Sequence, residues 1–141
     1  MTSLAANAAR ESRNLGSKRE YQVAGSTTVY AGSLMMIKSD GYAAPAAASA
    51  SNQGCVGVAT EAVDNSGGAD GALKVEIQEG EFLLAADSIA ITSVNVKCYA
   101  DDDNTIDETQ ASNCPQAGVL TQVVSASQGW VAVGVAFSGQ V

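Results

Sequence analysis

Histidine is absent from this chain of 141 residues, and cysteine and aromatic residues are scarce. Without histidine, zinc sites of the ordinary kind are not expected, and a cysteine nucleophile would lack its usual base. Cys55, Cys98 and Cys114 are odd in number and widely spaced, with no C-x-x-C pair. We therefore predict that Cys55 and Cys98 are small buried hydrophobic residues in strands and that Cys114 lies in a loop.

Long hydrophobic runs are also missing. Gly, Ser, Asp or Asn interrupts every apolar stretch well before the roughly 18 residues that a membrane helix needs. The first residues do not form the apolar segment of a secretory signal. We expect a protein that is made in the cytosol and that has no membrane partner.

Positive charge is scarce beyond the first 20 residues. The net charge is −8, yet four of the seven basic residues lie in those 20 positions: Arg10, Arg13, Lys18 and Arg19. The rest of the chain holds three lysines and thirteen acids. An acidic body of this kind repels a phosphate backbone, so nucleic acid is not an expected partner.

Short apolar segments separated by turn residues are what the chain has in abundance from Tyr21 onward. "LKVEIQE" alternates strictly, with Leu73, Val75 and Ile77 on one face, which is typical of a half-buried strand. Regular short strands without helical spacers predict an all-β fold: a small single-domain β-barrel or β-sandwich of antiparallel strands over residues 21–141. The expected strands lie within 26–32, 33–39, 41–46, 54–60, 73–79, 81–86, 94–100, 104–109, 117–124 and 129–137.

Residues 1–20 differ from this body and are predicted to form an extended N-terminal arm. Their Ala-rich part, 2–14, is compatible with a short helix ending at Gly16, but such a helix is marginal by itself. We expect the arm to be loose in the free protein and to order on another protein as a helix or strand, so deleting it should hardly change the melting temperature. The candidate partner-contact residues are Leu4, Arg10, Arg13, Leu15, Lys18, Arg19 and Tyr21.

Acidic residues offer the remaining candidates for chemistry. The run "DDDNTIDE", 101–108, fits an EF-hand loop at Asp101, Asp103 and Thr105, but Ile106 replaces the required glycine and Ser112 the bidentate glutamate. A solvated hairpin tip is the preferred interpretation. Glu79 and Glu81 are a carboxylate pair, although nothing shows them converging on a cleft. We therefore predict no enzyme activity, no metal site and no cofactor.

The order of the segments carries a resemblance to a known family. "VAGSTTVYAGSLMMIKSDGYAAPA" is followed by "GCVGVATEAVDNSGGADGALKVEIQEGEF", "VKCYADDDNTID", "AGVLTQV" and "GWVAVGV". In this order, over roughly residues 22–137, they resemble the small capsid decoration, or cement, proteins of tailed bacteriophages.

The resemblance implies a structural role on the virion. Such a protein binds the outer surface of the mature, expanded capsid and clamps neighbouring capsomers, so its partners would be the major capsid protein and other copies of itself, most commonly as a homotrimer. A protein that binds only the expanded lattice stabilises it by mass action. The alternative is a β-module displayed on the virion that binds host carbohydrate or protein, for which Tyr42 and Tyr99 would be the aromatic contacts.

Overall fold

The computed structural model describes residues 3–134, and this part of the chain is all-β, as predicted. All ten expected segments contain a strand, although 135–137 of the last segment lie outside the described residues. Three further strands, β1, β2 and β7, were not expected. The strands are β1 (Ser12–Arg13), β2 (Lys18–Gln22), β3 (Thr27–Val29), β4 (Leu34–Lys38), β5 (Ala43–Pro45), β6 (Asn52–Ala59), β7 (Val63–Asn65), β8 (Lys74–Gln78), β9 (Gly80–Ala86), β10 (Lys97–Ala100), β11 (Thr105–Asp107), β12 (Gln116–Ser125) and β13 (Gln128–Val133).

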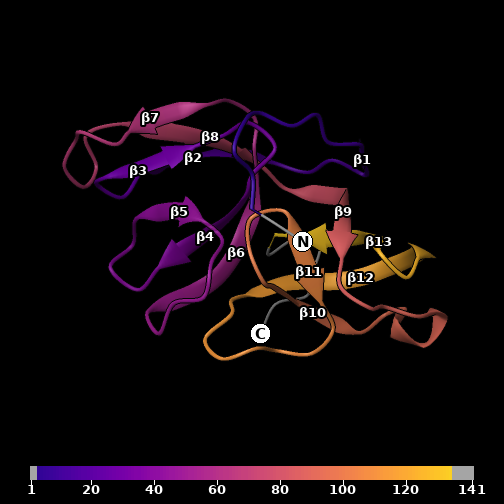
Figure 1. Cartoon of the computed structure of the whole chain (residues 1–141). Coiled ribbons are helices and arrows are strands. Elements are labelled where there is room, and N and C mark those ends of the chain that lie inside the picture. Colours follow the sequence, from indigo (N-terminus) through magenta and orange to yellow (C-terminus); the bar gives the residue numbers. More distant parts are fainter. Residues whose placement is uncertain (1–2, 135–141) are drawn as a thin grey trace.

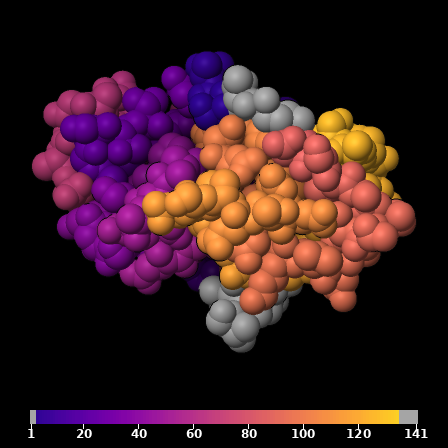
Figure 2. All heavy atoms as spheres, turned by 60° about the horizontal axis from the view of Figure 1, so that its bottom comes forward, coloured from indigo at the N-terminus to yellow at the C-terminus, as the bar shows by residue number. Residues whose placement is uncertain are grey.

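The strands form two groups that lie side by side (Figure 1). β2, β8, β6, β4 and β5 make one sheet in that order, and a bridge between Val23 and Ala43 brings its two edges together. β3 and β7 form a separate antiparallel pair beside it. Figure 2 shows the same division on the surface, with the first half of the chain on one side and the second half on the other.

The second group closes into a five-stranded barrel. Its strands follow the order β9, β11, β10, β12, β13, and β13 pairs back onto β9 through six residues from Gln128 to Val133. Most neighbours are antiparallel, but β11 runs parallel to β9. Closure removes the unpaired edges that an open sheet would expose.

Two hydrophobic cores hold the molecule together, and β4 contributes to both. Successive side chains of a strand point to opposite faces. Leu34 and Met36 enter the larger core, which joins the two groups, whereas Met35 enters the smaller core within the first group. The larger core also buries Cys55 and Cys98, as predicted. The shared core is why the two groups form one domain.

The chain passes from the first group to the barrel at Glu79 and Gly80, between β8 and β9. Gly80 has φ +152, and a Cβ there would lie 3.0 Å from Leu15 Cδ2. Glycine therefore lets the arm approach the crossover closely.

Helical structure is nearly absent from residues 3–134. One 3₁₀ turn, η1 (Ile91–Ser93), is all that the described chain contains, and no helix there is long and apolar enough to cross a membrane.

Candidate functional site

The arm lies along the body, contrary to the expected loose conformation. β1 pairs antiparallel with β9, placing Arg13 opposite Glu81, and β2 pairs antiparallel with β8 from Lys18 to Gln22. Between them, Gly16 N–H donates to the carbonyl of Glu79, and Glu79 N–H donates to that of Ser17. The arm thus runs antiparallel to the whole crossover between the two groups.

The short helix with which residues 2–14 are compatible is not formed in the part that the structure describes, since 3–14 contain no helix. The physical reason is a competition between local and distant contacts. An isolated alanine-rich helix of this length gains little in water, whereas the extended arm gains backbone pairing and charge contacts with the body. The boundary expected at residue 20 also falls inside β2.

Arg13 connects the arm to the barrel wall through three contacts. Its Nε donates to Glu81 Oε2 at 3.3 Å, and its second terminal nitrogen donates to Gln122 Oε1 at 2.9 Å. The guanidinium lies 4.1 Å from the centre of the Trp130 ring, a cation–π contact. Trp130 is half-buried beneath it, so its ring forms an internal contact with the arm.

Glu81 is a buried acid, and the arm supplies much of the hydrogen bonding and positive charge that stabilise its carboxylate. Asn14 Nδ2 and Thr121 Oγ1 donate to its carboxylate in addition to Arg13. Burial raises the pKa of Glu81, but these hydrogen bonds and the charge of Arg13 outweigh it, leaving the pKa below its ordinary value. The carboxylate is therefore held in its charged form.

Glu79 is buried in the same way but pairs with a different arginine. Arg19 donates to Glu79 Oε1 at 2.5 Å, and the Glu79 side chain is 3% exposed. Glu79 and Glu81 are thus each held by the arm, and neither is presented as a free acid of a catalytic pair. Lys18 makes a longer and more exposed contact, 3.9 Å from Glu76.

The first part of the arm reaches the β10–β11 turn. Leu4 N–H donates to Asp103 Oδ1 at 2.9 Å, and Arg10 donates to the Gly32 carbonyl and to Asn104 Oδ1. Burial lowers the pKa of Arg10, while the charges of Asp103 and Asp102 raise it in part. Asp103 is buried and also accepts a hydrogen bond from Ser33 Oγ at 2.8 Å.

The remaining predicted contact residues lie apart from these pairs. Tyr21 is half-buried and packs against the smaller core, whereas Leu15 is 54% exposed. The structure therefore commits Leu4, Arg10, Arg13, Arg19 and Tyr21 to the body, and leaves Leu15 and Lys18 accessible among the residues that the sequence suggested.

Arg13→Gln should destabilise the protein by about 1 to 2 kcal/mol, because it removes an ion pair and the ring contact but leaves Glu81 two other donors. Urea unfolding followed by the emission of Trp130, the one tryptophan of the chain, measures this. Lys18→Gln is the matched control and should cost less than about 0.5 kcal/mol, since its ion pair is exposed. Equal losses in the two variants would contradict the role assigned to Arg13.

An exposed apolar patch was not foreseen from the sequence. Of six large hydrophobic residues exposed in the described chain, four lie on the loop between β9 and β10 or on β12: Ile91, Val94, Val96 and Val124. The loop runs along β12, with Asn95 N–H donating to the Leu120 carbonyl and Ile89 N–H to that of Ala126. We call these four residues the apolar patch. Large apolar residues exposed on neighbouring segments mark binding sites more often than single scattered ones do.

A polar hollow lies on the first group of strands where it meets the barrel. It has a volume of about 700 Å³ and lies between the loops around 49–56 and 110–116, with Asn52, Gln53, Asn113 and Gln116 on its walls. No aromatic side chain lines it. Sugar rings are commonly held on aromatic faces, so this lining does not favour a carbohydrate ligand.

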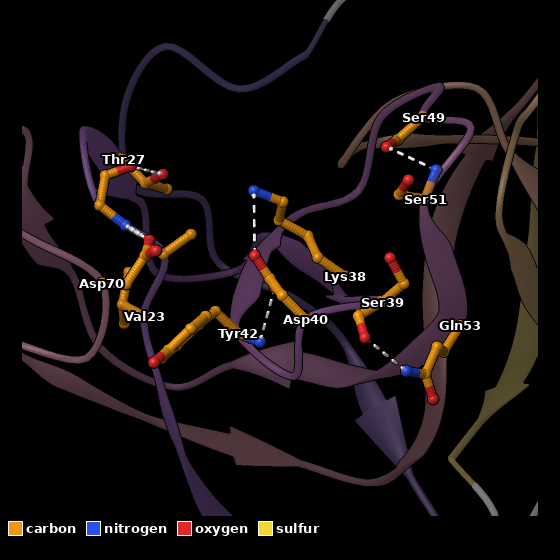
Figure 3. Close-up of polar contacts among 12 residues, drawn as sticks. Val23, Thr27, Lys38, Ser39, Asp40, Tyr42, Ser49, Ser51, Gln53 and Asp70 are labelled. Atoms are coloured by element: carbon orange, nitrogen blue, oxygen red, sulfur yellow. Dashed lines mark hydrogen bonds and ion pairs between the residues drawn. The ribbon is translucent and has the colours of Figure 1, made fainter.

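Tyr42, one of the two aromatics considered for glycan binding, is half-buried against the larger core. Its backbone N–H donates to Asp40 Oδ1, and Asp40 lies 4.0 Å from Lys38 Nζ, which closes the β4–β5 turn (Figure 3). In the same view, Gln53 Nε2 donates to the Ser39 carbonyl and ties β6 to this turn. Tyr42 is thus part of a packed turn.

The cysteines are buried thiols. Burial raises the pKa of Cys98 to about 12, and that of Cys55 also lies well above its ordinary value for the same reason. Thiols held in this form are poor nucleophiles at neutral pH. Cys114 lies in a loop, as predicted, but it is also buried.

The hairpin tip predicted at 101–104 is formed between β10 and β11, but it is not solvated throughout as expected, because Asp103 is buried. The EF-hand arrangement is not formed, because Asp103 points to Ser33 and the arm. Asp101 lies instead beside Asp87 and Asp107.

Comparison with known proteins leaves the family open: no protein-family model matches the chain, and no curated protein or solved structure matches it significantly.

Proposed function

We propose that this protein is a structural component of a bacteriophage virion that binds the outer surface of the mature, expanded capsid and clamps neighbouring capsomers. The observation that carries the proposal is the apolar patch on an otherwise acidic, all-β body. A preformed surface on a rigid barrel suits attachment to a rigid lattice, because little conformational entropy is lost on binding. The order of the strand segments, which resembles that of cement proteins, supports the same role.

The proposed contact surface centres on the patch rather than on the arm. The basic residues of the arm that we first considered are largely paired with acids of the body, so breaking those pairs would oppose binding. Leu15 and Lys18 remain candidate contacts because they are exposed. We propose that copies act as homotrimers on the major capsid protein and that many modest contacts add up over the shell.

Co-sedimentation with capsid shells of the parent phage tests this function. The intact protein should bind expanded shells at least about tenfold more tightly than unexpanded precursors, since clamping requires different affinities for the two lattice states. Bound copies should saturate in multiples of three. Equal binding to both shells would contradict the mechanism.

A pair of variants locates the contact surface in the same assay. Ile91→Asp should weaken binding to expanded shells by about tenfold or more, because it places a charge in an apolar interface. Leu73→Asp is the matched control, since Leu73 is also exposed but precedes β8 in the other group of strands. If both variants bind like the intact protein while expansion still matters, the patch is excluded but the function stands.

A further inference from the structure

Three carboxylates converge on the outside of the barrel from three separate segments. Asp87 follows β9, Asp101 follows β10, and Asp107 ends β11. One carboxylate oxygen of each lies within 4.8 Å of those of the other two. Asp87 lies outside the acidic run that the sequence made conspicuous, so the run alone did not reveal the arrangement.

The strand register shows why these side chains share a face. Ile106 pairs with Ala100 on one side and Ala86 on the other, and all three enter the larger core. Residues one position along each strand therefore point outward. These outward positions are Thr105 and Asp107 on β11, Asp101 after β10 and Asp87 after β9.

By register, Thr105 shares this face with Asp101 and Asp107. Asp101 lies opposite it across the turn, where Asp101 N–H donates to the Thr105 carbonyl, and Asp107 is two residues further along the same strand. The Thr105 side chain is fully buried, and its hydroxyl is the one buried side-chain polar atom in the described chain without a hydrogen-bond partner. An unsatisfied buried hydroxyl is rare in proteins and points to a missing ligand or water.

The three negative charges have no positive counterpart among the described residues. The ion pairs that residues 3–134 form involve Glu81, Glu76, Glu79 and Asp40, and none reaches the three aspartates. Asp107 accepts a hydrogen bond from Thr109 N–H, and the buried thiol of Cys114 lies 3.9 Å from Asp101 Oδ1. Burial raises the pKa of Asp101, and the charges of Asp107, Asp87 and Asp102 raise it further.

We propose that Asp87, Asp101 and Asp107 bind a divalent cation, with the Thr105 hydroxyl supplying a further oxygen directly or through water. An all-oxygen set without histidine is the chemistry that Ca²⁺ prefers, and its tolerance of irregular geometry suits ligands on three strand ends, with waters completing the shell. The ion would join the end of β9 to the β10–β11 turn. That same turn carries Asp103, which holds the arm.

Calorimetric titration of the full-length, EDTA-treated protein with CaCl₂ tests the site. We expect one ion per chain with a dissociation constant on the order of 10⁻⁴ M, as for other partly exposed sites. Saturating Ca²⁺ should raise the melting temperature by about 5 °C or more, and equal Mg²⁺ by less. No heat and no thermal shift at about 100 times that concentration would overturn the proposal.

Matched variants separate a specific site from general attraction to an acidic protein. Asp107→Asn should weaken Ca²⁺ binding at least about tenfold while leaving the fold intact, since it also relieves repulsion. Asp40→Asn removes one charge from an exposed turn in the other group and should bind Ca²⁺ like the intact chain. Equal weakening in both variants would overturn the site. Zn²⁺ binding that exceeds Ca²⁺ binding and is lost in Cys114→Ser would overturn the assignment to an oxygen-preferring ion.

Discussion

A chain that begins at Ser17 should melt about 10 °C or more below the intact protein. Truncation removes Leu4, Arg13 and Asn14 and leaves the buried carboxylates of Glu81 and Asp103 without their donors from the arm. Removing one side of a buried ion pair typically costs about 3 to 5 kcal/mol, because the remaining charge stays desolvated. Thermal unfolding followed by circular dichroism measures the difference.

Rescue variants test the reason for this loss. In the truncated chain, Glu81→Gln and Asp103→Asn should recover part of the melting temperature, since a buried amide costs less than an unpaired carboxylate. A truncated protein that melts within roughly 2 °C of the intact one would show that the arm contributes little, as the sequence first suggested.

Acidification should reduce the difference in melting temperature between the intact and the truncated chain. The pKa of Glu81 lies below its ordinary value in the folded protein, so its contacts with the arm add stability above the pKa of the unfolded chain. That stability is lost as the pH falls through the folded pKa. The melting temperature of the intact chain should therefore approach that of the truncated chain progressively below about pH 4.5. A difference that grows there would contradict the role assigned to Glu81.

Gly118→Ala should destabilise the protein by about 3 kcal/mol or more. Gly118 is buried on β12, and a Cβ there would lie 1.9 Å from the Ala132 carbonyl oxygen on β13. Two backbones of a closed barrel have little freedom to separate, because each strand is paired on both sides. Urea unfolding gives the change in free energy.

Gly67→Ala is the matched control for this substitution. A Cβ at Gly67 meets nothing within 4 Å, and its φ is not in the left-handed region. The control should change stability by less than about 0.5 kcal/mol. If the two variants unfold within about 1 kcal/mol of each other, the close approach of β12 and β13 is not as tight as described.

The strands could be predicted wherever the sequence carries a local pattern of apolar and turn residues. Each of the ten expected segments has apolar residues bounded by turn residues, and such patterns report burial directly. β2 was missed because only Tyr21 in "KREYQ" is large and apolar, so its pairing with β8 decides its conformation. Gln78 shows the same limit, since strict alternation predicted an exposed side chain but the arm buries it.

The contacts of the arm could not be predicted from local pattern at all. The uneven charge distribution indicated that a basic segment and an acidic body attract each other, but not which acids are buried. Glu81 resembles any turn glutamate in "EGEF", and Asp103 any residue of a solvated tip. Their burial follows from the three-dimensional path of the arm, whereas the convergence of Asp87 with Asp101 and Asp107 follows from the register of β9, β10 and β11.

The path of the arm also sets an order for folding during synthesis. Leu4 contacts Asp103 across 99 residues, and Arg13 contacts Gln122 across 109 residues, so the first segment to leave the ribosome must wait for some of the last. At typical rates of translation this wait is roughly 5 to 20 s. Throughout it, the nascent arm lacks its contacts with Asp103 and Gln122. The N-terminal arm is therefore synthesised first but completes its contacts only after nearly all of the chain has been made.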